Sequence, residues 1–307
     1  MKSDSELMNE LSHKSNYLYE LTSEESGCLK AILLDIYKDI ACLCDRNELI
    51  YMLSGGSCLG AVRHHGFIPW DDDLDIMMPR NDYEKFIALC EKGGLGDKYE
   101  IDYPNPITDS KNVFLKIYKK GTLNIEVFNE NTPFPKGISV DIFPLDYVPK
   151  SRVVQGIKGF IANLLQFISI LVLNVQYPSQ SLKEFVILDK QLYYRYKIKQ
   201  ILGYLFSVVK HQKWVYWFDK FVKSSSKTPF IGIPTGRKYY NGEIFEKSVY
   251  LPPRKAKFES LDVYIPNDYH CYLTNLYKNY MQLPPINKRE RHFVIKLAFR
   301  SEERRVG

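Results

Sequence analysis

Four carboxylates fall within five positions of this chain, and that crowding restricts how the surrounding segment can fold. They are Asp71, Asp72, Asp73 and Asp75. Like charges held this close destabilise a folded protein unless a cation balances them. Oxygen ligands favour hard divalent cations, so the cluster predicts a Mg²⁺ or Mn²⁺ site. The neighbouring Trp70 and Leu74 are apolar, which favours the wall of a cleft over a solvated loop.

The spacing of Asp73 and Asp75 adds a geometric argument. Residues 74–78 read as a strand, in which alternate side chains share a face and lie about 7 Å apart. Two carboxylates at that spacing suit one or two bridging metals, so we predict that both are metal ligands and catalytic residues. We expect Asp71 and Asp72 to contact the metal ligands without binding the metal, or to stabilise the conformation of the loop. An acidic surface turn is the alternative, since a lone Asp-x-Asp is common.

A glycine-rich turn precedes the acids. Gly55, Gly56 and Ser57 follow a short apolar run and open a helix, where backbone N–H groups and the helix dipole favour an anion. We predict that these three residues contact a phosphate, although most such turns are structural. Arg63 follows on the same helix and could clamp a phosphate through two N–H groups.

Two further polar residues interrupt apolar strand patterns. Asp141 lies in Ile-Ser-Val-Asp-Ile-Phe, and a buried carboxylate is costly unless it is paired or bound to metal. We predict that it completes the metal site or acts as general base, the alternative being a residue at a strand end. Lys116 could neutralise phosphate charge, or it could be an outward-facing strand lysine. Arg289 and His292 could reach the cleft, but the sequence gives little reason to predict that they do.

The order of expected elements indicates the fold class. A capping box at Thr22 begins a helix that ends near Asn47, and strands are expected over 99–103, 113–118, 122–128 and 138–143. Helices flanking a mixed, mostly antiparallel sheet make an α+β arrangement. We expect a catalytic core over 1–150, a helical basic insertion over 151–235 and a C-terminal segment over 236–299 that packs on the core.

The insertion is basic and aromatic. Residues 183–227 hold ten Lys/Arg and three Asp/Glu, whereas the whole chain has a net charge of +6. Together with aromatic residues such as Trp217 and Phe218, this composition favours either contact with an anionic membrane or acceptor polymer, or a solvated lysine face. Residues 157–175 are apolar but interrupted by polar residues, so we expect a buried or interfacial helix and not a membrane span. We expect no nucleic-acid partner.

The ends and the cysteines bear on location. The opening MKSDSELMNELSHKSN is polar, and the six cysteines show no Cys-x-x-Cys spacing. We therefore expect a cytoplasmic protein, with peripheral contact on the inner face of the membrane left open. Residues 300–307 read like the translation of a sequencing-library adapter, and we expect them not to belong to the native chain.

Several stretches resemble the LicD family of phosphotransferases. The matching text is Leu53-Ser-Gly-Gly-Ser, Leu59-Gly-Ala-Val-Arg-His, Gly66-Phe-Ile-Pro-Trp-Asp-Asp-Asp-Leu-Asp-Ile and Val140-Asp-Ile-Phe-Pro-Leu-Asp146. The resemblance implies a nucleotidyltransferase-like fold that uses Mg²⁺ or Mn²⁺. It also implies transfer of phosphocholine, or a related phosphoalcohol, from a CDP-linked donor to a glycan hydroxyl. The acceptor would belong to a cell-surface polysaccharide, lipopolysaccharide or teichoic acid, and it could be lipid-linked.

Carried over by position, the resemblance makes Asp73, Asp75 and Asp141 metal ligands and makes Gly56 and Ser57 donor contacts. The chain departs from the family at residues 277–280, where Tyr-Lys-Asn-Tyr stands in place of the usual Tyr-Gly-Asp-Tyr. Two alternatives therefore stay open. One is transfer of the nucleotide itself, and the other is a glycan-binding member without catalysis.

Overall fold

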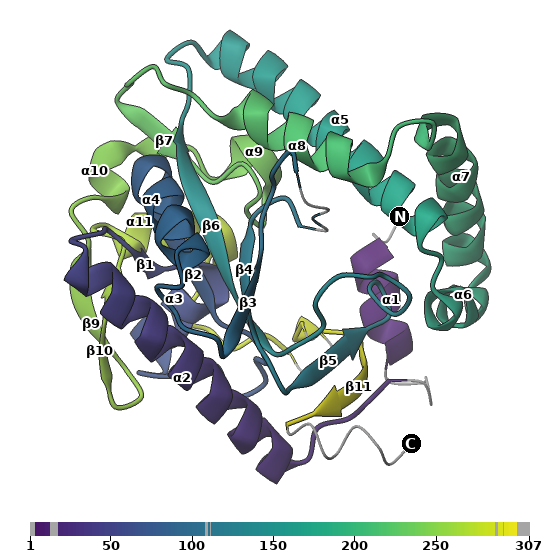
Figure 1. Cartoon of the computed structure of the whole chain (residues 1–307), viewed down its shortest axis with the longest axis horizontal. Coiled ribbons are helices and arrows are strands. Elements are labelled where there is room, and N and C mark those ends of the chain that lie inside the picture. Colours follow the sequence, from purple (N-terminus) through teal and green to yellow (C-terminus); the bar gives the residue numbers. More distant parts are fainter. Residues whose placement is uncertain are drawn as a thin grey trace.

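A curled mixed sheet forms the centre of the structure, a computed structural model that describes residues 4–12, 18–107, 110, 112–285, 288–290 and 292–299 (Figure 1). Its main path runs β1 (Met52–Leu53), β2 (Asp75–Pro79), β6 (Ser139–Tyr147), β4 (Leu115–Lys119) and β3 (Tyr99–Asp102). Neighbouring strands are antiparallel except β2 and β6, which run parallel. At the far end of β6, β7 (Phe230–Gly232) and β8 (Phe245–Glu246) extend the sheet. The expected mixed sheet flanked by helices is confirmed.

The register of the central strands brings three predicted site residues side by side. Asp75 on β2 is opposite Asp141 on β6, and Asp141 is opposite Lys116 on β4. Leu74 and Ile76 are buried on either side of Asp75, as the alternation of strand side chains requires. Residues far apart in the sequence therefore converge because their strands are neighbours.

Helices cover the sheet and hold the loops that carry the site. The predicted capping box is confirmed, because the Glu25 N–H donates to Thr22 Oγ1 at 3.2 Å and α2 (Ser23–Arg46) begins there. The Lys30 side chain of α2 donates a hydrogen bond to the backbone carbonyl of Pro69, in the loop that precedes the four aspartates, at 3.0 Å. The other helices on this part of the chain are α3 (Gly55–Arg63) and α4 (Arg80–Glu91).

Residues 152–222 are helical apart from short connections. They form α5 (Arg152–Gln176), α6 (Gln180–Ile187), α7 (Lys190–Phe206) and α8 (His211–Val222). Phe218 of α8 is fully buried, Trp214 packs against both Phe206 and Trp217, and Trp217 is itself 41% exposed. Helix α1 (Asp4–Ser12) joins α6 and α7 in a second, smaller apolar cluster. The predicted domain boundaries at 150 and 235 stay predictions.

By length and composition, α5 is able to cross a membrane despite its polar residues, and the predicted buried or interfacial position stays a prediction. Of its most apolar window, 39% is buried inside the protein. Its inner side packs against α7, α8 and α9 (Tyr239–Gly242). Length and composition therefore leave both a crossing and an in-plane position open for this helix.

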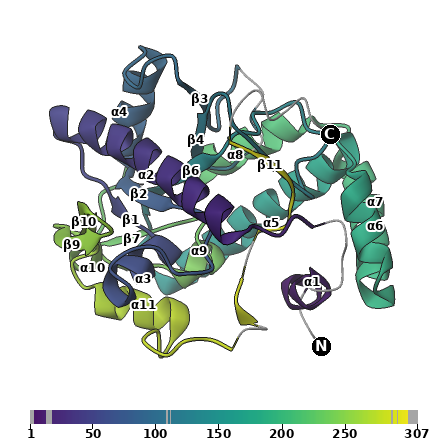
Figure 2. The same cartoon turned by 90° about the horizontal axis from the view of Figure 1, so that it is seen from below.

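The C-terminal part of the chain packs against α3 and β1, and its predicted boundaries stay predictions. After α10 (Lys247–Tyr250) come a hairpin of β9 (Arg254–Phe258) and β10 (Leu261–Ile265), then α11 (Tyr269–Tyr277), which packs against α3 (Figure 2). The last strand, β11 (Val294–Ala298), pairs antiparallel with β5 (Leu123–Glu126). We call the described residues between α11 and β11 the strap, namely 278–285, 288–290, 292 and 293. The suspected adapter segment 300–307 lies outside the described residues.

Candidate active site

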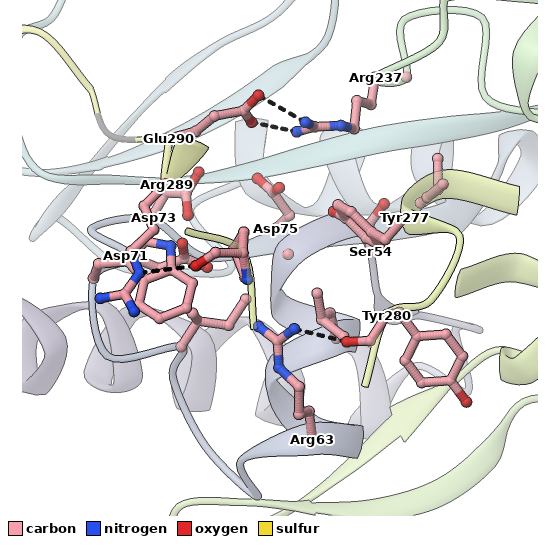
Figure 3. A pocket seen from close by; sticks show the side chains of 18 of the residues that line it. Ser54, Arg63, Asp71, Asp73, Asp75, Arg237, Tyr277, Tyr280, Arg289 and Glu290 are labelled. Carbon is pink, nitrogen blue, oxygen red and sulfur yellow. Dashed lines mark hydrogen bonds and ion pairs between the residues drawn. The ribbon is translucent and has the colours of Figure 1, made fainter. Parts of the chain in front are cut away.

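A pocket of about 780 Å³ opens where the N-terminus of α3 meets the start of β2 (Figure 3). The glycine turn (54–56) and the acidic loop (71–75) form one wall. The loop that enters α9 (235–239), with Glu243 beyond the helix, forms another, and the strap crosses the pocket. The pocket thus joins the two motifs that the sequence singled out with two segments that it did not.

The environment of the pocket disfavours the charged form of three of its aspartates. Burial, followed by the charges of neighbouring aspartates, raises the pKa of Asp71 to about 8 and the pKa of Asp73 to about 6. The same causes hold the pKa of Asp75 well above its ordinary value. A bound cation would relieve this repulsion.

The carboxylate ligands in the pocket fit a hard cation that is bound partly by the protein and partly by the substrate. Among the described residues, no three His, Cys, Asp or Glu side chains converge as a ready-made metal site. Mg²⁺ is commonly held by only one or two carboxylates together with substrate phosphates and water. Asp73 and Asp75 can supply such a partial set, whereas a closed all-protein cage is absent from the described part of the chain.

Asp141 and Lys116 form an ion pair beside the pocket. Lys116 Nζ lies 2.8 Å from Asp141 Oδ1, and neither residue is among those that line the pocket. Burial alone would lower the pKa of Lys116, but the Asp141 carboxylate outweighs burial and holds that pKa above its ordinary value. The side chain of Lys116 is 18% exposed, so the outward-facing alternative does not describe it. Their roles toward metal and phosphate stay predictions.

The glycines let the carboxylates approach the start of α3. Gly55 has a φ of +47°, a conformation that favours glycine. A Cβ atom on Gly56 would lie 3.1 Å from Asp71 Oδ2, and one on Gly55 would lie 3.4 Å from Asp75 Oδ2. Ser57 is buried, and its Oγ accepts a hydrogen bond from the Asp75 N–H at 2.9 Å. Ser57 therefore positions the start of β2, and its contact with a donor phosphate stays a prediction.

Arg63 reaches the pocket and also holds the strap. One of its terminal N–H groups donates to the Tyr280 carbonyl at 2.7 Å, and its Nε donates to His64 at 2.9 Å. The guanidinium lies 6.0 Å from the centre of the Trp70 ring. It is thus placed for a phosphate, but in this structure it bonds to the chain itself.

The strap brings charged residues that sequence reasoning missed or left open. His292 Nδ1 lies 2.7 Å from Asp72 Oδ1, and the Asp72 charge raises the pKa of His292 well above its ordinary value. The Arg289 guanidinium stacks 4.1 Å from the centre of the Trp70 ring. Glu290 accepts two hydrogen bonds from Arg237, as Figure 3 shows. No local motif marks these residues, since their proximity depends on the pairing of β11 with β5.

A second missed group is the buried carboxyl of Glu243. Burial raises its pKa to about 7. It accepts a hydrogen bond from the Tyr272 hydroxyl at 3.4 Å, and that hydroxyl accepts one from the Gly55 N–H at 3.0 Å. Glu243 and Tyr272 therefore fix the first turn of α3, although neither lies in a recognisable motif.

At residues 277–280, where the sequence differs from the family pattern, the backbone has an unusual conformation. Lys278 has a φ of +61° and a ψ of −111°, a conformation that residues with a side chain rarely adopt. Glycine, which the family resemblance leads one to expect at this position, would adopt it without strain. Asn279 and Tyr280 line the pocket, so the segment keeps its place at the site.

Comparisons with known proteins identify the family to which this part of the chain is similar. A model of the LicD/FKTN/FKRP nucleotidyltransferase domain matches residues 48–158, which include the glycine turn, all the predicted acids and Lys116. Lipopolysaccharide cholinephosphotransferase LicD of Haemophilus influenzae is 27% identical over 285 residues, which cover 90% of this chain and 97% of that protein. The chain belongs to the LicD family. The predicted resemblance is confirmed.

Two other relatives match shorter stretches. The human ribitol 5-phosphate transferase FKRP is 36% identical over 76 residues, which are 25% of this chain and 14% of FKRP. An uncharacterised protein of Rickettsia typhi, RT0683, is 46% identical over 158 residues, which are 39% of this chain and 50% of that protein. Of these three similarities, the one to Haemophilus LicD spans nearly the whole length of both proteins.

Proposed function

We propose that this LicD-family protein is a phosphotransferase that moves a phosphorylated alcohol from an activated donor to a glycan hydroxyl. One observation carries the proposal: crowded carboxylates face a glycine turn at a helix N-terminus inside one pocket. Such a pocket offers an anion site next to a cation site. The relatives named as a cholinephosphotransferase and a ribitol 5-phosphate transferase support this reaction class.

The donor that suits this pocket is a CDP-linked alcohol. Its diphosphate would lie between the glycine turn and the acids, where the Gly56 N–H and the Arg63 guanidinium can bind phosphate oxygens. Asp73 and Asp75 would hold Mg²⁺ or Mn²⁺, which when bound would balance charge on the diphosphate. Because Arg63 also bonds to the strap, donor binding would require this guanidinium to exchange partners or share them.

The transfer itself needs an acceptor hydroxyl close to the donor phosphorus. The hydroxyl oxygen forms the new P–O bond as the bond to CMP breaks, and the hydroxyl proton passes to a carboxylate. The Gly56 N–H and Arg63 stabilise the charge that develops on the phosphoryl oxygens. Aromatic residues of the pocket, Trp70 and Tyr277 among them, offer the flat surfaces on which sugar rings pack.

Binding of the donor is tested by thermal unfolding. CDP-choline, CDP-ribitol and CDP-glycerol are each added with and without Mg²⁺, because a ligand that binds the native state raises the melting temperature. A shift that requires both Mg²⁺ and one of the donors would support the proposal and identify the alcohol. The absence of any shift, with Mn²⁺ tried as well, would contradict the choice of donor.

Turnover is tested with Asp73→Asn, which removes one charge and preserves the shape of the side chain. We expect a loss of at least about a hundredfold in turnover with an unchanged circular dichroism spectrum, since the variant weakens cation binding and leaves the core in place. Asp262→Asn, at a largely exposed ion pair on β10, is the matched control. Activity retained in Asp73→Asn would refute the assignment. A donor labelled in the nucleotide distinguishes release of CMP from nucleotidyl transfer.

A further inference from the structure

Helix α5 exposes a continuous apolar stripe to solvent. Its members recur every three or four residues and so share one face of the helix. Val153 is 72% exposed and Phe160 is 69% exposed, values unusual for large apolar side chains. The stripe consists of Val153, Ile157, Phe160, Leu164 and Phe167. Exposed apolar patches of this extent mark surfaces that contact a partner or a membrane.

A second stripe with the same spacing runs along α7 and ends two residues beyond it, at Val208. It consists of Tyr194, Ile198, Ile201, Leu205 and Val208. The two helices pack closely, since a Cβ atom on Gly203 of α7 would lie only 2.6 Å from the Leu171 carbonyl oxygen of α5. Exposed apolar side chains are therefore present on two helices that pack against each other.

The segments that carry the two stripes contain basic residues and no acidic ones. Residues 150–180 hold three Lys/Arg and no acid, and residues 190–218 hold six Lys/Arg and no acid. Lys197 and Lys210 are exposed, while Arg195 and Lys199 pair with Asp4 of α1. Basic residues beside an apolar helix face match an anionic lipid surface, which attracts the cations while its acyl boundary takes up the apolar side chains.

We propose that α5 and α7 dock this protein on an anionic phospholipid bilayer, with their two apolar stripes at the headgroup boundary and α5 in the plane of the membrane. The inner side of α5 explains why the helix does not cross. Ala162, Leu171 and Val172 are buried in the protein, and Lys158 Nζ donates to the Val222 carbonyl at 3.0 Å. A crossing α5 would have to give up this packing.

Helix α5 also touches the wall of the pocket. A Cβ atom on Gly159 would collide with Asn241 of α9, and Asn163 Oδ1 accepts a hydrogen bond from the Tyr240 N–H at 3.3 Å. Tyr239 and Glu243, on either side of these contacts, line the pocket. About one helix diameter, roughly 10 Å, thus separates the docked face from the loop that forms this wall. The corollary, which rests on the proposed function, is that the acceptor is a membrane-anchored glycan.

The docking surface is tested with the full chain and vesicles of phosphatidylcholine with or without phosphatidylglycerol. We expect flotation with the anionic vesicles, a weaker association with the neutral ones, and release by high salt. The double variant Ile157→Asp, Phe160→Asp should bind at least about tenfold more weakly, because two apolar side chains no longer enter the interface. Ile107→Asp changes an isoleucine that is 87% exposed elsewhere, and it should bind like the parent.

Three outcomes would overturn the proposal. Equal binding by the double variant and the Ile107 control would show that the α5 stripe is not the docking face. A purified dimer that the double variant converts to monomer would show that a second copy covers it. Resistance to extraction from vesicles by alkaline carbonate would show that α5 crosses the bilayer.

Assays with a donor and a water-soluble acceptor separate this proposal from the proposed function. If docking fails while turnover is retained, only the surface assignment is wrong. If the double variant keeps turnover on a soluble acceptor but loses at least about tenfold on a vesicle-bound one, both docking and the anchored acceptor are supported. Parent protein that binds vesicles but transfers nothing would support docking and contradict the proposed reaction.

Discussion

A buried charge cluster joins the helical insertion to the core, and it gives the sharpest prediction for stability. Arg80, at the start of α4, donates to both carboxylate oxygens of Asp146 on β6, at 2.8 and 2.6 Å. A third donor of Arg80 reaches Asp219 of α8 at 2.7 Å. Arg80 is 5% exposed and Asp146 is fully buried. Because water is excluded, each charge depends on the others for its stability.

Asp146→Asn removes one charge without changing the shape of the side chain. One oxygen acceptor becomes an NH₂ donor that faces the Arg80 donors, so the guanidinium loses a bond and its main counter-charge. Breaking a buried pair in this way costs about 3–5 kcal/mol in the free energy of unfolding. At about 2–4 °C per kcal/mol for a domain of this order of size, the melting temperature should fall by roughly 6–20 °C.

The assay is urea unfolding followed by circular dichroism and by tryptophan fluorescence. All three tryptophans lie at residues 70, 214 and 217, so fluorescence follows both the pocket and α8. The control is Asp262→Asn, whose ion pair with Lys257 is about two-thirds exposed and should leave stability unchanged. If Asp146→Asn unfolds at the same urea concentration as this control, the cluster does not support the fold and the reasoning is wrong.

Two further predictions concern the site. Asp71 and Asp73 have raised pKa values of about 8 and about 6, so between their ordinary value and these the folded state binds protons that the unfolded state releases. Without divalent cation, stability should therefore fall as the pH rises from about 4 to about 8, and Mg²⁺ should raise the melting temperature more at pH 8 than at pH 5. A pH slope that is equally steep in Asp71→Asn and Asp73→Asn would contradict this cause. Separately, Lys278→Gly should increase the free energy of unfolding by about 1 kcal/mol by relieving the positive φ, whereas Lys278→Ala should not. Equal melting temperatures for these two variants would show that the backbone there is unstrained.

Local sequence patterns were enough to predict the elements of the core, because their signals are contained in a few residues. The capping box at Thr22 and the alternation around Asp75 each depend on neighbours in the chain, and both are present in the structure. The aspartates were recognisable because four like charges within five residues rarely occur without a ligand. The fold class followed from the order of these elements.

The remainder of the site depends on contacts between distant residues, which no local pattern encodes. Glu290 meets Arg237, and His292 meets Asp72, only because the strap crosses the pocket. The pairing of Lys116 with Asp141 requires the register of β4 on β6. The insertion was correctly predicted to be basic and helical, but its composition could not show that Phe218 points inward while the apolar face of α5 points outward.

The strap is a loop whose two ends are both fixed by regular secondary structure, so its own contacts do not have to hold those ends together. One end continues from α11, and the other is anchored where β11 pairs with β5. The pairing of β11 with β5 therefore already compensates for the chain entropy that is lost when this loop closes. That entropy loss increases only slowly with the length of the loop. The polar contacts of the strap, such as that of His292 with Asp72, then need only fix its position over the acids. Insertions in the strap should consequently be tolerated far better than any change that unzips β11, although β11 lies outside the pocket lining.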